Sequence, residues 1–289
     1  MDSFGQNLKK YRMALGLSQK ELGERIGLKQ TTIANYENNV RFPKGKNLKN
    51  FAFLLNMSID GLLDGDADSS KLNVDERIYE ASQKKFIKAL FEWDEFSALE
   101  IIKKLEQNST NVLIIYEKII KKSMYDIGEL WSLGRLSVIQ EHYATQVCQK
   151  AVTLLSRNFI VNDNHVDSAI CMTINPEEHN LGVLIICDTL KSIGINAYFI
   201  GSKIPTGQLI EALIQYKIRY LALSLSMKEH YDGLQNLITI LRSEKALDPL
   251  KIIVGGRAFE DDVESAFSCG GDMYAKDPFD LIEQLRIIS

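Results

Sequence analysis

Cysteine is scarce in this sequence, and its few copies stand far apart. The four cysteines are Cys148, Cys171, Cys187 and Cys269, and no two of them form a C-x-x-C pair. The sequence therefore predicts neither a zinc cluster nor a disulfide framework. We expect reduced thiols, most of them buried.

Long apolar runs are also missing. No run approaches the roughly 18 residues that a membrane-spanning helix needs. The first residues, MDSFGQNLKKYRMALG, are polar and charged and do not have the pattern of a signal peptide. These features predict a cytoplasmic protein. Internal repeats and low-complexity segments are absent as well.

The amino acids that are present suit several packed domains. A chain of 289 residues with 45% hydrophobic content can fill two or three cores. The net charge is −4, yet residues 1–65 hold ten Lys/Arg against six Asp/Glu, so this part carries +4 and the remainder −8. The asymmetry predicts an anion-binding module at the N-terminus.

Changes of pattern divide the chain into parts. A polar, acidic stretch predicts a linker over residues 66–73, after an all-α domain of residues 1–65. Residues 74–160 have helical apolar spacing, which predicts an α-helical bundle. Residues 166–289 alternate five short apolar runs with helical ones, which predicts an α/β, flavodoxin/Rossmann-like domain with a parallel five-stranded sheet.

A helix-turn-helix pattern lies in LSQKELGERIGLKQTTIANYENN. Ser18 and Glu21 predict a capping box at the start of one helix, and Gly27 allows a sharp turn before a second helix over Lys29–Glu37. This pattern resembles the lambda-repressor/Cro (XRE) helix-turn-helix family, and the resemblance covers about residues 4–64.

In that family the second helix enters the major groove of double-stranded DNA. Its base-reading positions correspond here to four polar residues: Gln30, Thr31, Thr32 and Asn35. Asn and Gln side chains suit adenine in particular. The candidate phosphate contacts are Gln19, Lys29, Arg41, Lys44 and Lys46. The resemblance therefore implies a DNA operator as a partner.

The loop after the first predicted strand reads NPEEHNLG and spaces Glu177, His179 and Gly182 as E-x-H-x-x-G. Loops at the carboxyl ends of parallel strands are where open sheets bind ligands. Further matches follow along the chain: GSKIP at Gly201–Pro205, Ser224, and Gly255-Gly256. Together they resemble the D-x-H-x-x-G … S-x-L … GG signature of the cobalamin-binding domains shared with methionine synthase and methylmalonyl-CoA mutase.

This resemblance implies a role for each residue. His179 would displace the dimethylbenzimidazole and coordinate cobalt from below, while Glu177 would hold the other imidazole nitrogen. The remaining candidates are Gly182 beside the nucleotide tail, Ser224 at the displaced base, Gly255 and Gly256 along the slot, and Ser226, which stands where the signature has Leu. Because of Ser226, we expect the packing around the base to differ.

A third pattern lies in WSLGRLSVIQEHYAT, within the predicted bundle. Gly134 suits the end of one helix, and a capping box over Ser137–Gln140 predicts the start of the next. Trp131 and the pair Glu141-His142 then lie on neighbouring helices. On composition alone, an equally good interpretation is that Trp131 belongs to the core and His142 to the surface.

The spacing Trp-(nine residues)-Glu-His resembles the Car-type cobalamin-dependent photoreceptor repressors. That likeness implies that Trp131 covers the adenosyl group above the corrin, with Glu141 and His142 hydrogen-bonding ribose or adenine. In those sensors a histidine follows the tryptophan and ligates cobalt after illumination. Here the position is Ser132, a poorer ligand, so we expect no bis-histidine adduct by that route. Those sensors also carry a MerR-type winged helix, whereas this chain resembles the XRE class.

These patterns favour a non-enzymatic, cobalamin-responsive transcriptional regulator that assembles as a dimer or tetramer. The expected cofactor is adenosylcobalamin, and the signal is light or the abundance of cobalamin. Two other classes stay open: an interaction module whose cobalamin-type fold binds haem or no cofactor, and a corrinoid carrier in methyl transfer. The E-x-H-x-x-G residues argue against the first of these, and the fused DNA reader argues against the second.

Overall fold

The computed structural model describes residues 4–14, 17–55, 59–64, 69–108, 110–159, 167–174, 176 and 179–288. The chain divides into two compact units, Met1–Ile119 and Ile120–Ser289. In the described residues, no helix combines the length and the apolar character that crossing a membrane requires.

The N-terminal domain in the first unit is all-α. Its helices are α1 (Phe4–Ala14), α2 (Gln19–Arg25), α3 (Gln30–Glu37), α4 (Gly45–Leu54) and α5 (Ile59–Asp64). Each helix contributes one fully buried side chain to a common core: Leu8, Leu22, Ile33, Phe51 and Leu62. The predicted capping box of Ser18 and Glu21 is present, and Gly27 has a φ of +70° in the turn before α3. Both predictions are confirmed.

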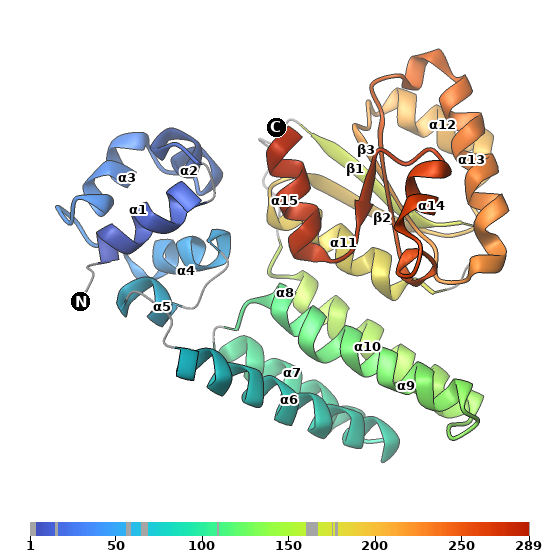
Figure 1. Cartoon of the computed structure of the whole chain (residues 1–289), viewed down its shortest axis with the longest axis horizontal. Helices are drawn as coiled ribbons and strands as arrows, with labels where there is room; N and C mark the ends of the chain where they lie inside the picture. Colours follow the sequence, from blue (N-terminus) through green and yellow to red (C-terminus); the bar gives the residue numbers. More distant parts are fainter. Residues whose placement is uncertain are drawn as a thin grey trace. The chain divides into compact units, whose positions relative to one another are not determined.

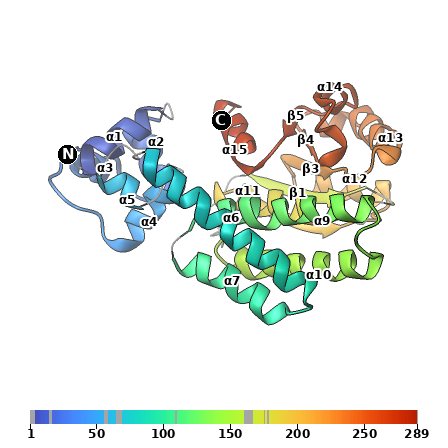
Figure 2. The ribbon, with the colours of Figure 1, turned by 60° about the horizontal axis from the view of Figure 1, so that its bottom comes forward.

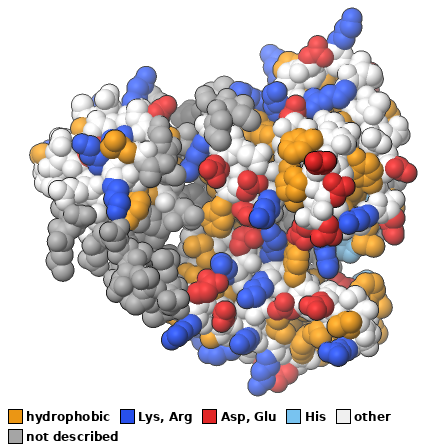
Figure 3. Space-filling model, in the orientation of Figure 1, with side chains coloured by type: hydrophobic (Ala, Val, Ile, Leu, Met, Phe, Trp, Pro, Cys, Tyr) orange, Lys and Arg blue, Asp and Glu red, His pale blue; other side chains and the backbone are white. Residues whose placement is uncertain are grey.

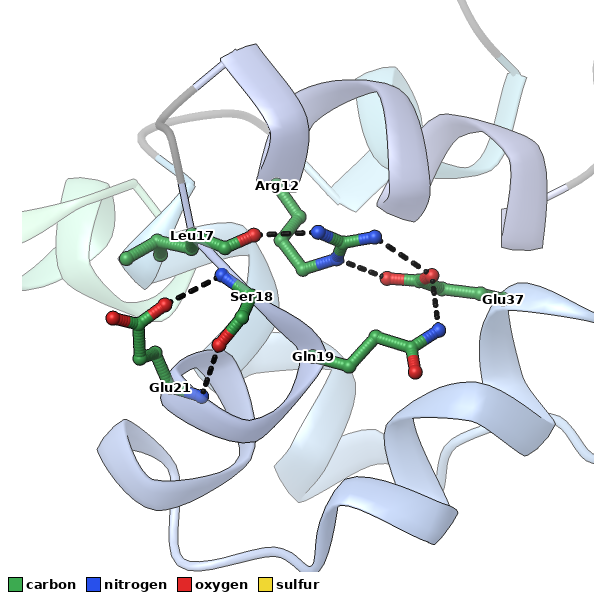
Figure 4. A network of polar contacts seen from close by, with 6 residues as sticks. All are labelled: Arg12, Leu17, Ser18, Gln19, Glu21 and Glu37. Carbon is green, nitrogen blue, oxygen red and sulfur yellow. Dashed lines mark hydrogen bonds and ion pairs between the residues drawn. The ribbon is translucent and has the colours of Figure 1, made fainter.

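A buried ion pair joins α1 to α3 (Figure 4). The side chain of Glu37 is 1% exposed, and Arg12 Nη2 lies 3.1 Å from its Oε2. Arg12 also donates to the backbone oxygen of Leu17, and Gln19 Nε2 donates to Glu37 Oε2 at 2.8 Å. Because each charge has a hydrogen-bonded partner, the network fixes α1, α2 and α3 relative to one another.

The remainder of the first unit is helical. It contains α6 (Ser69–Phe91), α7 (Glu95–Gln107) and α8 (Val112–Ile115), and α6 packs against α7. Asp94 caps α7 by accepting a hydrogen bond from the Ser97 N–H at 2.9 Å. A π-helical turn, Tyr116–Lys121, continues α8 into the next helix.

The predicted linker 66–73 differs from the structure in its second part. α6 begins at Ser69, so residues 69–73 are helical, while residues 66–68 lie outside the described residues. The segment contains neither Gly nor Pro. Relative to Ala, each of its Ser and Asn residues destabilises a helix by only about half a kcal/mol. Polar composition alone therefore did not prevent the helix from starting early.

Two helices open the second unit. α9 (Lys122–Ser132) and α10 (Val138–Ser156) run side by side (Figure 1 and Figure 2). In the turn between them Gly134 has a φ of +68°, and the capping box over Ser137–Gln140 opens α10, which confirms both sequence predictions. At the end of α10, the Ser156 hydroxyl donates to the buried carboxylate of Asp188.

The sheet has the predicted five parallel strands. They are β1 (Ser168–Thr173), β2 (Asn196–Gly201), β3 (Tyr220–Ser224), β4 (Lys251–Gly255) and β5 (Met273–Ala275), in the order β2-β1-β3-β4-β5. The strand order reverses its direction between β1 and β3. Their loops therefore meet at a topological switch point, where sheets of this class bind ligands.

Helices cover both faces of the sheet. One face packs on α11 (Leu181–Ser192) and α15 (Pro278–Ile288), and the other on α12 (Thr206–Gln215), α13 (Tyr231–Ser243) and α14 (Val263–Ser268). All four cysteines are free thiols and buried, as predicted. Burial raises the pKa of the Cys171 thiol in β1 well above its usual value, so this thiol stays protonated.

Two glycines allow the backbone to pack closely at the carboxyl ends of β3, β4 and β5. Gly256 has a φ of +107°, and a Cβ atom there would lie 2.3 Å from the backbone oxygen of Leu225. At Gly255 a Cβ would lie 2.8 Å from the backbone oxygen of Ala275. The Leu225 N–H donates to the Gly255 oxygen at 2.9 Å, and the Ala258 N–H to the Leu225 oxygen at 3.1 Å. Backbone packing therefore requires both glycines.

We expect Arg12→Leu to destabilise the N-terminal domain by about 3–5 kcal/mol, because it leaves the Glu37 carboxylate buried without its cation. The double variant Arg12→Leu/Glu37→Leu should recover much of this loss. Hydrogen exchange at the amides of α1 and α3 in the full chain measures both effects. Equal losses of protection in the single and the double variant would contradict this account of the ion pair.

We expect Gly256→Ala to destabilise the second unit by about 3 kcal/mol or more, because the new methyl group adds a clash to an unfavourable backbone conformation. Gly207→Ala is the matched control, since nothing lies within 4 Å of a Cβ atom at that position of α12. Hydrogen exchange of the β3 and β4 amides reports the difference. If Gly256→Ala and Gly207→Ala protect these amides from exchange equally well, the close approach of Leu225 does not require glycine at position 256.

Candidate functional site

The helix α3 presents polar side chains on one side and apolar ones on the other. Ile33 and Tyr36 are buried in the core of the N-terminal domain. Among the predicted base readers, Gln30 and Thr31 are exposed. The other two, Thr32 and Asn35, are half-buried. The structure therefore leaves one face of α3 accessible, with the predicted residues on it.

Basic side chains accompany this helix. The exposed ones among the predicted phosphate contacts are Lys29, Arg41, Lys44 and Lys46. Lys29 is the N-cap residue of α3, and the N–H groups of Val40 and Arg41 donate to the Asn35 oxygen just after its end. Figure 3 shows Lys and Arg side chains on the visible face of this domain. A positive, polar surface of this kind suits the phosphate backbone of DNA.

Gln19, the remaining predicted phosphate contact, is held by a residue that the sequence analysis did not single out. Its amide donates to the buried carboxylate of Glu37. Because an amide nitrogen has two N–H groups, this bond orients the side chain and leaves donor capacity for a second acceptor. In the sequence, Glu37 is only an acidic residue at the end of the second predicted helix. Nothing near it indicates that it pairs with Arg12, 25 residues earlier.

The ends of β1, β3 and β4 lie side by side at the carboxyl edge of the sheet. In the strand register Thr173 stands next to Ser224, and Ser224 next to Gly255. Gly182 is exposed in the first turn of α11, and a Cβ atom there would lie 3.5 Å from Ser224 Oγ. Three residues that are distant in the sequence, Gly182, Ser224 and Gly255, thus surround one place.

His179 is exposed on the loop between β1 and α11. Its neighbour Asn180 is the N-cap residue of α11, and Asn180 Oδ1 accepts a hydrogen bond from Thr173 Oγ1 at 3.1 Å. Thr173 is fully buried, so this bond ties the loop to the end of β1. The sequence analysis did not foresee it. Glu177, the predicted partner of His179, lies outside the described residues.

The remaining candidates at this edge differ in what surrounds them. Ser226 is half-buried two residues after β3. Gly201 has a φ of +79° at the end of β2, and Pro205 precedes α12, so the segment GSKIP forms the loop between them. At Gly255 and Gly256 protein backbone fills the space that a side chain would need. Close backbone packing therefore explains why glycine stands at both positions, whether or not they also line the predicted cobalamin slot.

Trp131 lies in the last turn of α9 and is 49% exposed, which excludes its interpretation as a core residue. Glu141 lies in the first turn of α10. The Thr145 hydroxyl donates to Glu141 Oε1 at 2.8 Å, and His142 Nδ1 lies 2.8 Å from Oε2. The carboxylate is thus fixed by two neighbours, while the side chain of His142 is 73% exposed.

More apolar surface surrounds the turn between α9 and α10. Its exposed apolar side chains are Leu133, Val138 and Ile139, in addition to Trp131. In α9, Tyr125 bonds Glu260 in the loop after β4. Lys121, the residue before α9, donates from Nζ to the backbone oxygen of Lys276 after β5 at 3.4 Å. The helix that carries Trp131 therefore adjoins the same edge of the sheet as the residues after β4.

Three models of known protein families match the chain. A helix-turn-helix model matches residues 8–62. Two models, each described as a B12 binding domain, match residues 82–156 and residues 168–283. The first of these covers the helices from α6 to α10, and the second covers the sheet with its surrounding helices.

Individual relatives are distant. The HTH-type transcriptional repressor CarH of Myxococcus xanthus is 25% identical over 144 residues, 50% of this chain and 47% of the repressor, so the match spans about half of that relative. The dimethylamine corrinoid protein 3 of Methanosarcina acetivorans is 23% identical over 177 residues, 60% of this chain and 80% of that protein.

One solved structure has the same fold over most of the chain. The monomethylamine corrinoid protein of Methanosarcina barkeri superposes with a TM-score of 0.64 at 18% identity and covers 73% of this chain and 99% of its own. The chain therefore carries a helix-turn-helix domain of the XRE type, followed by the two parts of a B12-binding module: a helical cap and an α/β domain with a five-stranded parallel sheet.

Proposed function

We propose that this chain is a cobalamin-responsive transcriptional regulator and not an enzyme. The observation that carries the proposal is the fusion of an accessible polar recognition helix, α3, with a B12-binding module in one chain. A ligand changes the affinity for DNA only if it binds two arrangements of the protein differently. Cobalamin would bias the assembly of subunits that read two half-sites. The repressor name of the Myxococcus xanthus relative supports this function.

Adenosylcobalamin is the proposed cofactor, and its lower side would face the carboxyl edge of the sheet. His179 supplies an exposed imidazole, which is a suitable nitrogen ligand for cobalt, and Glu177 is proposed to orient it. Ser224 is buried beside the exposed residue Gly182, and its hydroxyl is proposed to bond the displaced base. Among the described residues, His179 and Ser224 therefore suit the cofactor, which when bound would supply a light-sensitive cobalt–carbon bond.

The upper side of the site is proposed to consist of Trp131, Glu141 and His142. Trp131 offers a flat apolar surface, and the fixed carboxylate of Glu141 offers an acceptor to a ribose hydroxyl. The Ser132 hydroxyl already donates to the Glu129 oxygen at 2.8 Å. This bond supports the expectation that Ser132 supplies no ligand to cobalt after illumination.

Light is the proposed signal, and the abundance of cobalamin is the alternative that the same residues support. A corrinoid carrier in methyl transfer is a second candidate function, because corrinoid proteins are among the relatives. The N-terminal domain argues against it, since a carrier has no need of an exposed recognition helix. Absorption spectra of the purified protein with adenosylcobalamin, first in the dark and then illuminated, test the binding and the light response together.

We expect His179→Ala to weaken the binding of adenosylcobalamin about tenfold or more, because cobalt loses its protein ligand. The absorption spectrum of the bound cofactor should change to one without a histidine ligand. Titration in the dark, followed by absorption, measures both quantities. Affinity and spectrum equal to those of the unmodified protein would remove His179 from the proposed site.

We expect Asn35→Ala to reduce the discrimination between operator and random DNA by about 1–3 kcal/mol, because it removes a base-reading amide. Lys44→Ala is the control, since the loss of a phosphate contact weakens binding to both DNAs alike and lowers the salt dependence. Titrations at several salt concentrations, with an operator selected from random DNA, separate the two effects. If Asn35→Ala discriminates between operator and random DNA as well as the unmodified protein does, Asn35 does not contact the bases as proposed.

A further inference from the structure

One face of α9 lies along the loops at the carboxyl edge of the sheet. Lys121 ends the π-helical turn just before α9, and Tyr125 and Gly128 lie three residues apart on one side of α9 itself. Lys121 contacts the loop after β5, while Tyr125 and Gly128 contact the segment after β4. The contacts therefore form a stripe that begins at the residue before α9 and continues along one side of the helix.

Tyr125 makes the central contact of this stripe. Its hydroxyl donates to Glu260 Oε1, and the guanidinium carbon of Arg257 lies 5.3 Å from the centre of its ring. A cation over an aromatic ring is attracted by the ring's electron density. Two residues after β4 thus bind the two ends of one side chain: the hydroxyl and the ring face.

Gly128 allows Arg257 to lie close to the helix. A Cβ atom at Gly128 would lie 3.3 Å from Arg257 Nη1, which is closer than an ordinary van der Waals contact. A larger residue here would push the guanidinium away from α9. The sequence pattern alone gives no sign of this requirement, because a glycine inside a helix has no partner that can be identified from its neighbours.

The other end of the contact is anchored in the sheet. Arg257 directly follows Gly256, whose positive φ and contact with Leu225 fix the course of the backbone. Trp131 lies three residues beyond Gly128, about one helical turn. Trp131 thus lies on a helix that is bound to the loop after β4.

We propose that Tyr125, Arg257 and Glu260 form a clamp that holds α9 against the loop after β4 and thereby positions Trp131 over the cofactor site. The three residues are positioning residues, because they act on the site through α9. The second half of the proposal rests on the proposed function, whereas the first half concerns the protein without a cofactor.

Hydrogen exchange in the cofactor-free full chain tests the first half. Arg257→Gln should speed the exchange of the α9 amides about fivefold, because it removes the cation from the ring of Tyr125. Tyr125→Phe, which keeps the ring and removes the hydroxyl, should have a smaller effect in the same direction. α9 exchange in Arg257→Gln equal to that of the unmodified protein would overturn the clamp.

Arg219→Gln is the matched control for Arg257→Gln. Its guanidinium carbon lies 5.5 Å from the centre of the Tyr220 ring, and it pairs with Asp167 at the amino end of the strands, the opposite edge of the sheet. This variant should leave the exchange of α9 unchanged. Faster α9 exchange in both arginine variants would show a general loosening and would overturn a specific clamp.

Titrations with adenosylcobalamin and hydroxocobalamin in the dark test the second half. Arg257→Gln should lose about fivefold in affinity for adenosylcobalamin and little for hydroxocobalamin, because Trp131 is proposed to cover the adenosyl group. Equal losses for both, or none, would overturn the positioning of Trp131. If the unmodified protein binds neither cobalamin, the proposed function fails, and hydrogen exchange still decides whether the clamp exists.

Discussion

The candidate cofactor site depends on one constraint, the placement of β1 next to β3 at the centre of the sheet. Because the strand order reverses there, the loop with His179 and the end of β3 at Ser224 share one edge without a helix between them. The Thr173–Asn180 bond holds the loop after β1 to the end of that strand. Gly256 allows the loop after β4 to pack against Leu225 in the loop after β3. The chemistry proposed for this edge thus rests on the strand order, one hydrogen bond between side chains and close packing of the backbone.

Local signals in the sequence were sufficient for much of the fold. The capping boxes at Ser18 and Ser137, the left-handed glycines and the five strands all follow from patterns within a few residues of each other. Contacts between distant segments were beyond such patterns. The pairing of Arg12 with Glu37 and of Tyr125 with Glu260 depends on how helices and loops pack, and a single sequence contains no record of that. The early start of α6 was missed because polarity is a weak signal against a helix.

The same residues serve the fold and the candidate site to different degrees. Gly255 and Gly256 are required by neighbouring backbone, so their presence alone says little about a ligand. Trp131 and His179 are different, because the described backbone does not require an indole or an imidazole at these accessible positions. The functional interpretation is therefore carried more by exposed side chains than by these glycines, and the two matching models of B12 binding domains agree with it.

The π-helical turn at Tyr116–Lys121 leads directly into α9. It joins α8 to α9 without a break, and the boundary between the two compact units falls inside it. A π-helical turn holds one residue more than an α-helical turn, so its conversion to regular helix would rotate α9 by about 100° about its own axis relative to α8. The number of residues in this turn therefore helps to decide which side of α9 carries Tyr125 and Gly128 toward the loop after β4.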